Sequence, residues 1–284
     1  MPQNSGGMPA LSCWSGQGQS FSSSSKAGLE KAARVHVLIT RPEPDASIWR
    51  AQLEALGHQV SVDPLLLVTF VQHDALPLAS IQGLIATSRN GLRGLRGLRD
   101  PAALAQAASL PLYAVGPGTA ELGRELGFRQ ITQGPASARD LAPVLAATID
   151  PTKGHLLHLS GDKIAYDLAA VLRPSGIRVD RVILYRSAPA LAFEPQTIDA
   201  LASGTLDAVA LTSPLSAHTF LKLAEQSLDL EHIQRLVYFC LSQNIADVFQ
   251  PITPRAVWVA AQPNTQAMFT LMEALAPTLV SRVL

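Results

Sequence analysis

Short apolar runs alternate with helix-forming stretches along most of this chain, and the alternation limits the folds that it can adopt. The first run, Val35-His36-Val37-Leu38-Ile39-Thr40, has the length and β-branched composition of a buried strand. A proline-rich break follows, and apolar residues at helical spacing then continue to Gly57, a typical helix stop. Strands separated by helices pair in parallel and are covered by helices on both faces. The pattern therefore predicts an α/β fold.

The alternation continues almost to the end of the chain. Predicted strands cover residues 35–40, 60–70, 83–88, 112–115, 155–159, 179–187, 208–212, 236–241 and 256–260. Predicted helices cover residues 46–56, 90–99, 116–126, 137–149, 164–172, 215–228, 244–249 and 265–275. The helix over 90–99 is marginal, because Gly91, Gly94 and Gly97 each cost roughly 1 kcal/mol relative to alanine.

Segments of the first half resemble segments of the second half at a nearly constant spacing. The pairs are Leu84-Ile85-Ala86-Thr87-Ser88 with Val209-Ala210-Leu211-Thr212-Ser213, Tyr113-Ala114-Val115 with Tyr238-Phe239-Cys240, and Pro135-Ala136-Ser137 with Pro263-Asn264-Thr265. The first two pairs are 125 residues apart and the third is 128 apart. Because the order is the same, we favour two related α/β lobes over chance likeness among α/β units.

Length and composition narrow the class of protein. A chain of 284 residues suits about two domains of roughly 150 residues each. With 48% hydrophobic and 15% charged residues, it can bury a large core. Lys and Arg number 22, as do Asp and Glu, so bulk charge does not favour binding to nucleic acid or an anionic membrane. No apolar run approaches 18 residues, so we expect no transmembrane helix.

The N-terminal segment differs from the rest of the chain. Residues 1–33 are rich in Ser, Gly and Gln, and we expect them to form a disordered leader. They resemble neither a secretory signal nor a transit peptide, and a native start near residue 33 is one interpretation. Cys13 lies in this leader and Cys240 in an apolar run, so we expect no disulfide framework. A reducing, cytoplasmic compartment fits.

Polar residues follow several predicted strands at the point where a helix begins. They are Thr87-Ser88, Gly116-Pro117-Gly118-Thr119 and Ser160-Gly161-Asp162-Lys163. The carboxyl ends of parallel strands meet at one edge of a sheet, and ligands bind there. Free N–H groups at the following helices favour an anion. We therefore expect two lobes to bind one polyanionic ligand in a cleft between them.

Two common ligand motifs are incomplete. Gly116-Pro117-Gly118 begins like a dinucleotide-binding loop, but Glu121 replaces the third glycine and Pro117 lacks a donor N–H. This disfavours a nucleotide-linked oxidoreductase. His155 and His158 lie three residues apart on a predicted strand, so their side chains point to opposite faces and a metal site is not expected.

Three other features allow two interpretations each. Arg93, Arg96 and Arg99 recur every third residue, which favours a solvated helix face over a carboxylate-binding surface. Arg41 ends the first strand, where a ligand-binding and a structural role are equally compatible with the sequence. Tyr185 lies between the predicted lobes and is either a packing residue or a weak acid that can donate a hydrogen bond.

Taken together, these segments resemble the uroporphyrinogen-III synthase family over about residues 35–280. The likeness starts with Val37-Leu38-Ile39-Thr40-Arg41-Pro42 and continues through Leu53-x-x-Leu56-Gly57-His58-x-Val60, Gly83-Leu84-Ile85-Ala86-Thr87-Ser88-x-Asn90-Gly91 and Ala114-Val115-Gly116-x-Gly118-Thr119-Ala120. It ends with Leu172-x-x-x-Gly176, Val182-x-Leu184-Tyr185 and Ala208-Val209-Ala210-Leu211-Thr212-Ser213. Each piece is short, and their order and spacing carry the resemblance.

The resemblance implies a particular fold. The family has two Rossmann-like or flavodoxin-like α/β lobes with parallel sheets, joined by a two-stranded β-ladder. Carried over to this chain, residues 35–67 plus 190–284 form one discontinuous lobe, and residues 71–187 form the other. The linker strands would be about 65–70 and 182–189.

The resemblance also implies a reaction. The family cyclises the linear tetrapyrrole hydroxymethylbilane to uroporphyrinogen III with loss of water and inversion of ring D, and it uses no cofactor or metal. Tyr185 matches the family's candidate for assisting departure of the hydroxyl group. By the same matching, the substrate-binding residues would be Arg41, Thr87, Ser88, Ser160, Gly161, Lys163, Thr212 and Ser213.

One segment departs from the family. Many members have Gly-Pro-Thr-Thr-Ala where this chain has Ser242-Gln243-Asn244-Ile245-Ala246. The threonine role therefore does not transfer, and we expect Ser242 and Asn244 to cap that helix and contact substrate instead. The expected partners are hydroxymethylbilane and the upstream hydroxymethylbilane synthase, with the chain a monomer. The alternative function is a two-lobed, non-catalytic binding protein for an anionic metabolite.

Overall fold

A computed structural model describes residues 34–100, 102–135 and 137–280, without the side chains of 275–280. All these residues belong to one compact unit, Ala33–Leu284. The predicted leader over residues 1–33, including Cys13, lies outside the described residues. Cys240 is a buried free thiol, and burial raises its pKa to about 12, so it is not a reactive thiolate.

The first sheet contains strands from both ends of the described chain. Its strands are β1 (His36–Ile39), β2 (Gln59–Val62), β9 (Ala208–Leu211), β10 (Val237–Cys240) and β11 (Ala256–Val259), all parallel in the order β11-β10-β9-β1-β2. Its helices are α1 (Asp45–Ala55), α7 (Pro195–Ser203), α8 (Pro214–Ser227), α9 (Leu230–Gln234), α10 (Gln243–Ala246) and α11 (Thr265–Val280), with a 3₁₀ segment at Asp247–Ile252.

The second sheet is formed by the middle of the chain. Its strands are β3 (Leu66–Phe70), β4 (Ile81–Ala86), β5 (Leu112–Val115), β6 (Ile131–Gly134), β7 (His155–Gly161) and β8 (Val179–Pro189), in the order β3-β8-β7-β4-β5-β6. Its helices are α2 (Arg89–Gly94), α3 (Ala103–Ala108), α4 (Pro117–Glu125), α5 (Ala138–Thr148) and α6 (Leu168–Leu172), with 3₁₀ segments at Leu95–Gly97, Pro151–Lys153 and Arg173–Ser175. Only β3 is antiparallel, through its pairing with β8.

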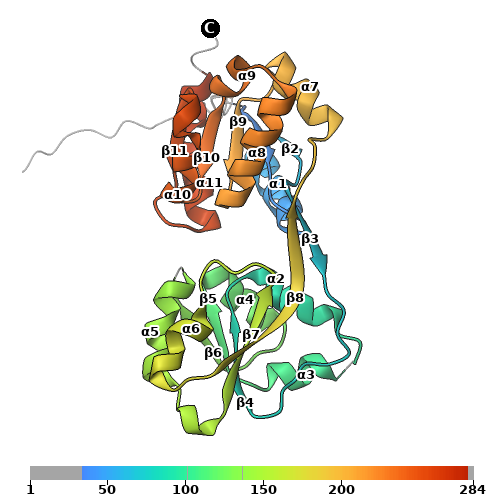
Figure 1. Ribbon diagram of the computed structural model, residues 1–284. Helices are drawn as coiled ribbons and strands as arrows, with labels where there is room; N and C mark the ends of the chain where they lie inside the picture. The colour runs from blue at the N-terminus through green and yellow to red at the C-terminus, as the bar shows by residue number, and fades with distance from the viewer. Residues whose placement is uncertain (1–33, 101, 136, 281–284) are drawn as a thin grey trace, which may run out of the picture. The chain divides into compact units, whose positions relative to one another are not determined.

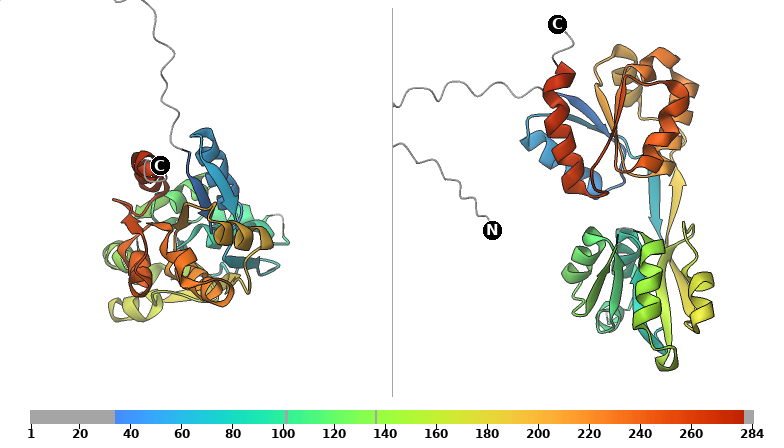
Figure 2. Two further views of the ribbon diagram at one scale, coloured as in Figure 1. Left: turned by 90° about the horizontal axis from the view of Figure 1, so that it is seen from above. Right: turned by 90° about the vertical axis from the view of Figure 1, so that its left-hand side faces the viewer.

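Both sheets are covered on their two faces, as Figures 1 and 2 show. The alternation of side chains along β1 explains this arrangement. Leu38 packs into one core with α8 and the stacked rings of Tyr238 and Phe249. Its neighbour Ile39 packs into a separate core beneath α1 and α11. Buried parallel strands are apolar on both faces for this reason, which confirms the α/β prediction.

The strand orders are those of two familiar doubly wound folds. Numbered along the chain, the first sheet has the flavodoxin-like order 2-1-3-4-5, and the parallel strands of the second have the Rossmann-like order 3-2-1-4-5. Strands β4, β5 and β6 hold the same places in one sheet as β9, β10 and β11 in the other. Ser88 and Ser213 also cap α2 and α8 in the same way. The order of strands thus supports the internal repeat.

The predicted two-stranded ladder is present. Strand β8 pairs in parallel with β7 along its first part and antiparallel with β3 from Tyr185 to Pro189. Figure 1 shows β3 and β8 running side by side between the two sheets. The predicted single strand over 60–70 is wrong. β2 stops at Val62, Pro64 interrupts the pairing, and β3 joins the other sheet.

The predicted helix over 90–99 is shorter than expected. α2 ends at Gly94 and continues only as a 3₁₀ turn. Two of its glycines permit a very close approach to the sheet, since a Cβ on Gly91 would lie 2.3 Å from the Leu159 carbonyl oxygen. A Cβ on Gly94 would lie 2.6 Å from the Leu184 Cβ. These glycines lower helix propensity but place α2 directly on β7 and β8.

We predict that Gly91→Ala destabilises the fold, because the added methyl group overlaps backbone that cannot move aside. The cost should be about 1–3 kcal/mol in the free energy of unfolding, measured by chemical denaturation. Gly97→Ala is the matched control, since its nearest neighbour would be Gln72 Nε2 at 3.7 Å. Equal stabilities for the two variants would contradict the close-packing explanation.

Candidate functional site

The carboxyl ends of strands from both sheets border one cavity of about 840 Å³. Five segments supply its wall: the β1–α1 connection with α1, the β4–α2 turn with α2, the β5–α4 turn with α4, Leu241 after β10, and the start of α11. In each sheet these strands adjoin the place where the strand order reverses, β1/β9 in one and β4/β7 in the other. Ligands of doubly wound folds bind at such points, so this cavity is the candidate site.

Besides α1, two helices of at least two turns begin at the cavity wall, α4 and α11. Gly116, with a φ of +73°, turns the chain into α4. Asn264 lies before α11, and its side-chain oxygen accepts the Ala267 N–H at 2.9 Å. The positive φ explains why glycine occupies position 116. The first N–H groups of a helix and its dipole favour negative charge, so both helix starts suit an anionic ligand.

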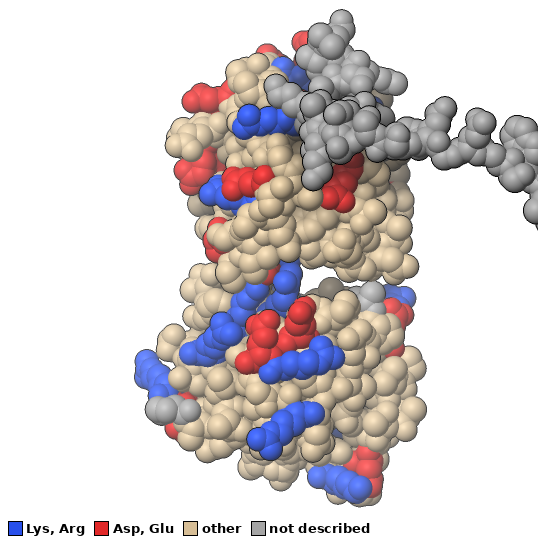
Figure 3. Space-filling model, turned by 180° about the vertical axis from the view of Figure 1, so that it is seen from behind, with Lys and Arg blue, Asp and Glu red and all other residues tan. Residues whose placement is uncertain are grey.

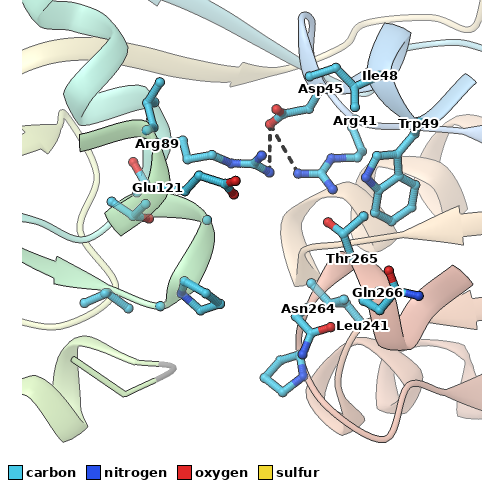
Figure 4. A pocket seen from close by; sticks show the side chains of 18 of the residues that line it. Arg41, Asp45, Ile48, Trp49, Arg89, Glu121, Leu241, Asn264, Thr265 and Gln266 are labelled. Atoms are coloured by element: carbon cyan, nitrogen blue, oxygen red, sulfur yellow. Dashed lines mark hydrogen bonds and ion pairs between the residues drawn. The ribbon is translucent and has the colours of Figure 1, made fainter. Parts of the chain in front are cut away.

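The most concentrated charge in the site is a cluster around Asp45. Its carboxylate contacts three arginines: Arg41 at 3.2 Å, Arg89 at 3.1 Å and Arg93 at 2.5 Å, each measured from Nη2. Figure 4 shows Asp45 between Arg41 and Arg89, with Trp49 beside Arg41. The Arg41 guanidinium lies 4.5 Å from the centre of the Trp49 ring. Only 10% of the Asp45 side chain is exposed.

Burial and charge act in opposite directions on this cluster. Burial tends to raise the pKa of Asp45, but the hydrogen bond from Arg93 and the charges of Arg41 and Arg89 outweigh it and lower that pKa. Burial lowers the pKa of Arg41 to about 10, against the attraction of Asp45. Arg41 and Asp45 are therefore both charged at neutral pH, and Arg89 and Arg93 bring the number of arginines around this carboxylate to three.

Three of the predicted site residues line the cavity: Arg41, Thr87 and Ser88. Ser88 caps α2 by accepting the Gly91 N–H, and its hydroxyl lies 2.9 Å from the Tyr185 hydroxyl. The Tyr185 ring packs against Gly161, where a Cβ would lie 2.8 Å from the ring carbon Cζ. The structure thus brings Ser88 and Gly161, at the ends of β4 and β7, together with Tyr185, where β8 changes its pairing from β7 to β3.

Thr87 has a partner that the sequence did not indicate. Its hydroxyl lies 3.0 Å from Nε2 of His158, which is 2% exposed. Burial, assisted by the charge of Arg181, lowers the pKa of His158 to about 4, so its ring is neutral at pH 7. The other histidine of the pair considered in the sequence, His155, contacts Asp180. The described residues contain no group of three potential metal ligands.

The other predicted site residues do not line this cavity. Ser160 is buried and accepts a hydrogen bond from Arg181, and Lys163 is exposed. Ser213 caps α8, while Thr212 is half-buried in front of it. The predicted capping by Ser242 is wrong. Ser242 holds the cap position of α10, a helix of only four residues, but its side chain makes no capping bond. Asn244 is exposed in that helix.

Several cavity residues were missed or given a different role. Asp45 was assigned to a proline-rich break, and Arg89 was not singled out. The pattern at 93, 96 and 99 favoured a solvated face, yet Arg93 is only 12% exposed and pairs with Asp45, whereas Arg99 is 68% exposed. The sequence contains one indication that Arg89 belongs to the site, because this residue directly follows Thr87-Ser88 at the end of a predicted strand. The pairing itself joins residues 48 positions apart and has no local signature.

Comparison with known proteins identifies the family. Residues 47–270 match the family model described as uroporphyrinogen-III synthase HemD. The chain belongs to the uroporphyrinogen-III synthase family. This is a family of cofactor-independent cyclising lyases in tetrapyrrole biosynthesis, which agrees with the resemblance in the sequence. No curated protein matches the chain.

Solved structures of this family share the fold. A uroporphyrinogen-III synthetase from Helicobacter pylori is 17% identical with a TM-score of 0.57, covering 85% of this chain and 99% of its own. A mutant uroporphyrinogen III synthase from the extremely thermophilic bacterium Thermus thermophilus is 19% identical with a TM-score of 0.52, covering 87% of this chain and 100% of its own. At these sequence identities the similarity establishes a shared fold only. The roles of individual residues have to be inferred from the geometry of the site.

The lowered pKa of His158 predicts a pH-dependent stability. The unfolded chain binds a proton near pH 6.5 but the folded chain only near pH 4, so stability falls as pH decreases through this window. Between pH 8 and pH 5, wild type should lose about 2 kcal/mol more unfolding free energy than His158→Gln. Denaturant titrations at both pH values measure this difference.

A matched control is His218→Gln, since the His218 side chain is exposed on α8. This variant should follow the wild-type pH dependence. If His158→Gln lost as much stability as wild type between the two pH values, the burial of a neutral His158 would be the wrong explanation.

Proposed function

We propose that this member of the uroporphyrinogen-III synthase family converts hydroxymethylbilane to uroporphyrinogen III in the cavity bordered by β1, β4 and β5. The observation that supports this cavity as the substrate site is its electrostatic character. Two helix starts and three arginines face a space of about 840 Å³. The substrate carries eight carboxylates, and such donors suit it without requiring a basic protein surface. Figure 3 shows basic and acidic side chains interspersed on one face of the molecule.

The reaction requires departure of a hydroxyl group and control of the following ring closure. Protonation of the hydroxymethyl group releases water and leaves an azafulvene cation at the end of the chain. A substituted pyrrole carbon attacks this cation to form a spiro intermediate, which fragments and recloses with ring D inverted. The protein therefore has to donate a proton, stabilise positive charge and hold the chain folded.

Tyr185 is the proposed proton donor. Its hydroxyl hydrogen-bonds to Ser88, which lines the cavity, and its ring is held against Gly161. Ser88 is fixed in turn by the α2 backbone. Support for Tyr185 is thus a defined orientation next to Ser88, a residue of the cavity wall, since proton transfer depends on placing the donor within hydrogen-bond reach.

Substrate binding is proposed for the remaining residues at the strand ends. Arg41, Thr87 and Ser88 have support from their place on the cavity wall. We retain Ser160, Gly161, Lys163, Thr212, Ser213, Ser242 and Asn244 as further contacts for a substrate that extends beyond this cavity. We further propose that residues 35–67 plus 190–284 and residues 71–187 act as two lobes around it.

The cellular setting is also a proposal. No helix among the described residues combines the length and apolar character that a membrane crossing needs. We propose a cytoplasmic monomer that receives its substrate from hydroxymethylbilane synthase, because hydroxymethylbilane closes spontaneously to the type I ring if it is not captured.

The decisive test is product analysis. Freshly prepared hydroxymethylbilane is incubated with the full chain, and the uroporphyrinogens are oxidised and separated by isomer. The expected result is the type III isomer above the spontaneous type I background. Type I product alone, from a folded protein, would contradict the proposed activity and leave the alternative of an anion-binding protein.

We predict that Tyr185→Phe lowers kcat roughly 10- to 100-fold, a modest loss for a general acid, because the leaving hydroxyl group retains water as a weaker donor. Folding should be almost unchanged, since only one partly buried hydrogen bond is lost. Tyr166→Phe is the control: Tyr166 is half-buried just before α6 and contacts Arg139 rather than the cavity. An unchanged kcat in Tyr185→Phe would remove Tyr185 from the mechanism.

A further inference from the structure

The arginine cluster has more hydrogen-bonding capacity than its internal partner can use. Each guanidinium carries five N–H donors, whereas the Asp45 carboxylate offers about four acceptor sites. Arg93 has a second partner in Asn90, at 3.0 Å from Nη1. Among the described residues, Asp45 is the hydrogen-bond or ion-pair partner of both Arg41 and Arg89. Donors are therefore left over at the cavity wall.

The charges around the cluster are also unequal. Arg41, Arg89 and Arg93 carry three positive charges against one negative charge on Asp45. Two more acids line the cavity, Glu121 and Glu125, but both are exposed on α4 and neither forms an ion pair within the described part of the chain. In Figure 4 the Glu121 carboxylate lies on the same side of the cavity as Arg89, and no dashed line joins it to the cluster. The cluster can accept another carboxylate group without first losing a cation.

The position of Asp45 allows it to be replaced. It is the first residue of α1, and its carboxylate reaches across to two arginines of α2. A carboxylate at the start of a helix is favourable even without an arginine partner, because of the helix dipole. Arg89 is already 30% exposed and lies beside Gly118 at the start of α4. A ligand carboxylate entering there would meet a guanidinium and a helix start together.

We propose that Arg41, Arg89 and Arg93 form a binding site for a carboxylate side chain of the substrate, and that Asp45 occupies this site when no ligand is bound. The inference rests on the proposed function and extends it to named carboxylate contacts. On binding, a substrate carboxylate takes over the donors that face Asp45. On release, Asp45 returns and displaces the product carboxylate. Asp45 therefore weakens ground-state binding and favours turnover.

The test uses Asp45→Asn, Arg93→Gln and the double variant in the full chain. The probe is uroporphyrin I, a stable octacarboxylate, whose dissociation constant is measured by fluorescence titration alongside KM for hydroxymethylbilane. Asp45→Asn should bind the probe about 3- to 10-fold more tightly and lower KM, because the competing carboxylate is gone. Arg93→Gln should weaken probe binding about 10-fold. In the Arg93→Gln background, Asp45→Asn should have a smaller effect than in wild type.

Glu54→Gln is the matched control, since it removes a negative charge from an exposed position of the same helix outside the cavity. It should leave the dissociation constant and KM unchanged. Circular dichroism and thermal denaturation establish that each variant is folded. If Asp45→Asn did not fold, Arg93→Gln would carry the test alone.

Three results would overturn the inference. They are weaker or unchanged probe binding in folded Asp45→Asn, unchanged binding in Arg93→Gln, or no binding of the probe by any form at millimolar concentration. Failure of the proposed function is a different result, namely wild type that produces only type I isomer. Because probe binding involves no turnover, the two failures are distinguishable.

Discussion

Parallel pairing of strands is the constraint on which the candidate site depends. When neighbouring strands run in the same direction, all of their carboxyl ends meet at one edge of the sheet. Thr40 and Arg41 follow β1, Thr87 and Ser88 follow β4, and Gly116 follows β5. Within each sheet, residues far apart in the chain thereby meet at one edge, and residues from the edges of both sheets border one cavity. The buried apolar strands behind them provide a rigid support, which polar loop residues alone could not.

The close packing of α2 on its sheet fixes the positions of polar groups in the site. With glycine at positions 91 and 94, the helix lies against the backbone of β7 and against Leu184 of β8. Its cap, Ser88, is then within hydrogen-bond distance of the Tyr185 hydroxyl on β8. A bulkier helix would stand farther from the sheet and would move Ser88 away from Tyr185. The two glycines therefore lower the helix propensity of α2, but they let the helix lie close enough to the sheet to position the Ser88 hydroxyl.

Charge in the site is local rather than a property of the whole chain. The chain carries equal numbers of acidic and basic residues, yet three arginines converge on one buried carboxylate. Low exposure strengthens each of these interactions, because solvent screens them less than it screens surface ion pairs. A polyanionic ligand can thus be recognised at a few positions by a protein without net charge. The neutral His158 behind Thr87 adds a hydrogen bond without adding charge.

The sequence by itself determined the α/β class, most of the strands, the repeat between the two halves and the family. These features depend on local composition and periodicity, which a strand such as 208–212 displays without its neighbours. Arg41, Thr87 and Ser88, which follow strands, were predicted as site residues from the family resemblance, and the cavity wall contains all three. Only the folded chain reveals that Arg93 is just 12% exposed and that Asp45 meets arginines of α2. Such contacts join residues dozens of positions apart, and their energy depends on distance and burial, which the folded chain sets and the order of residues does not display.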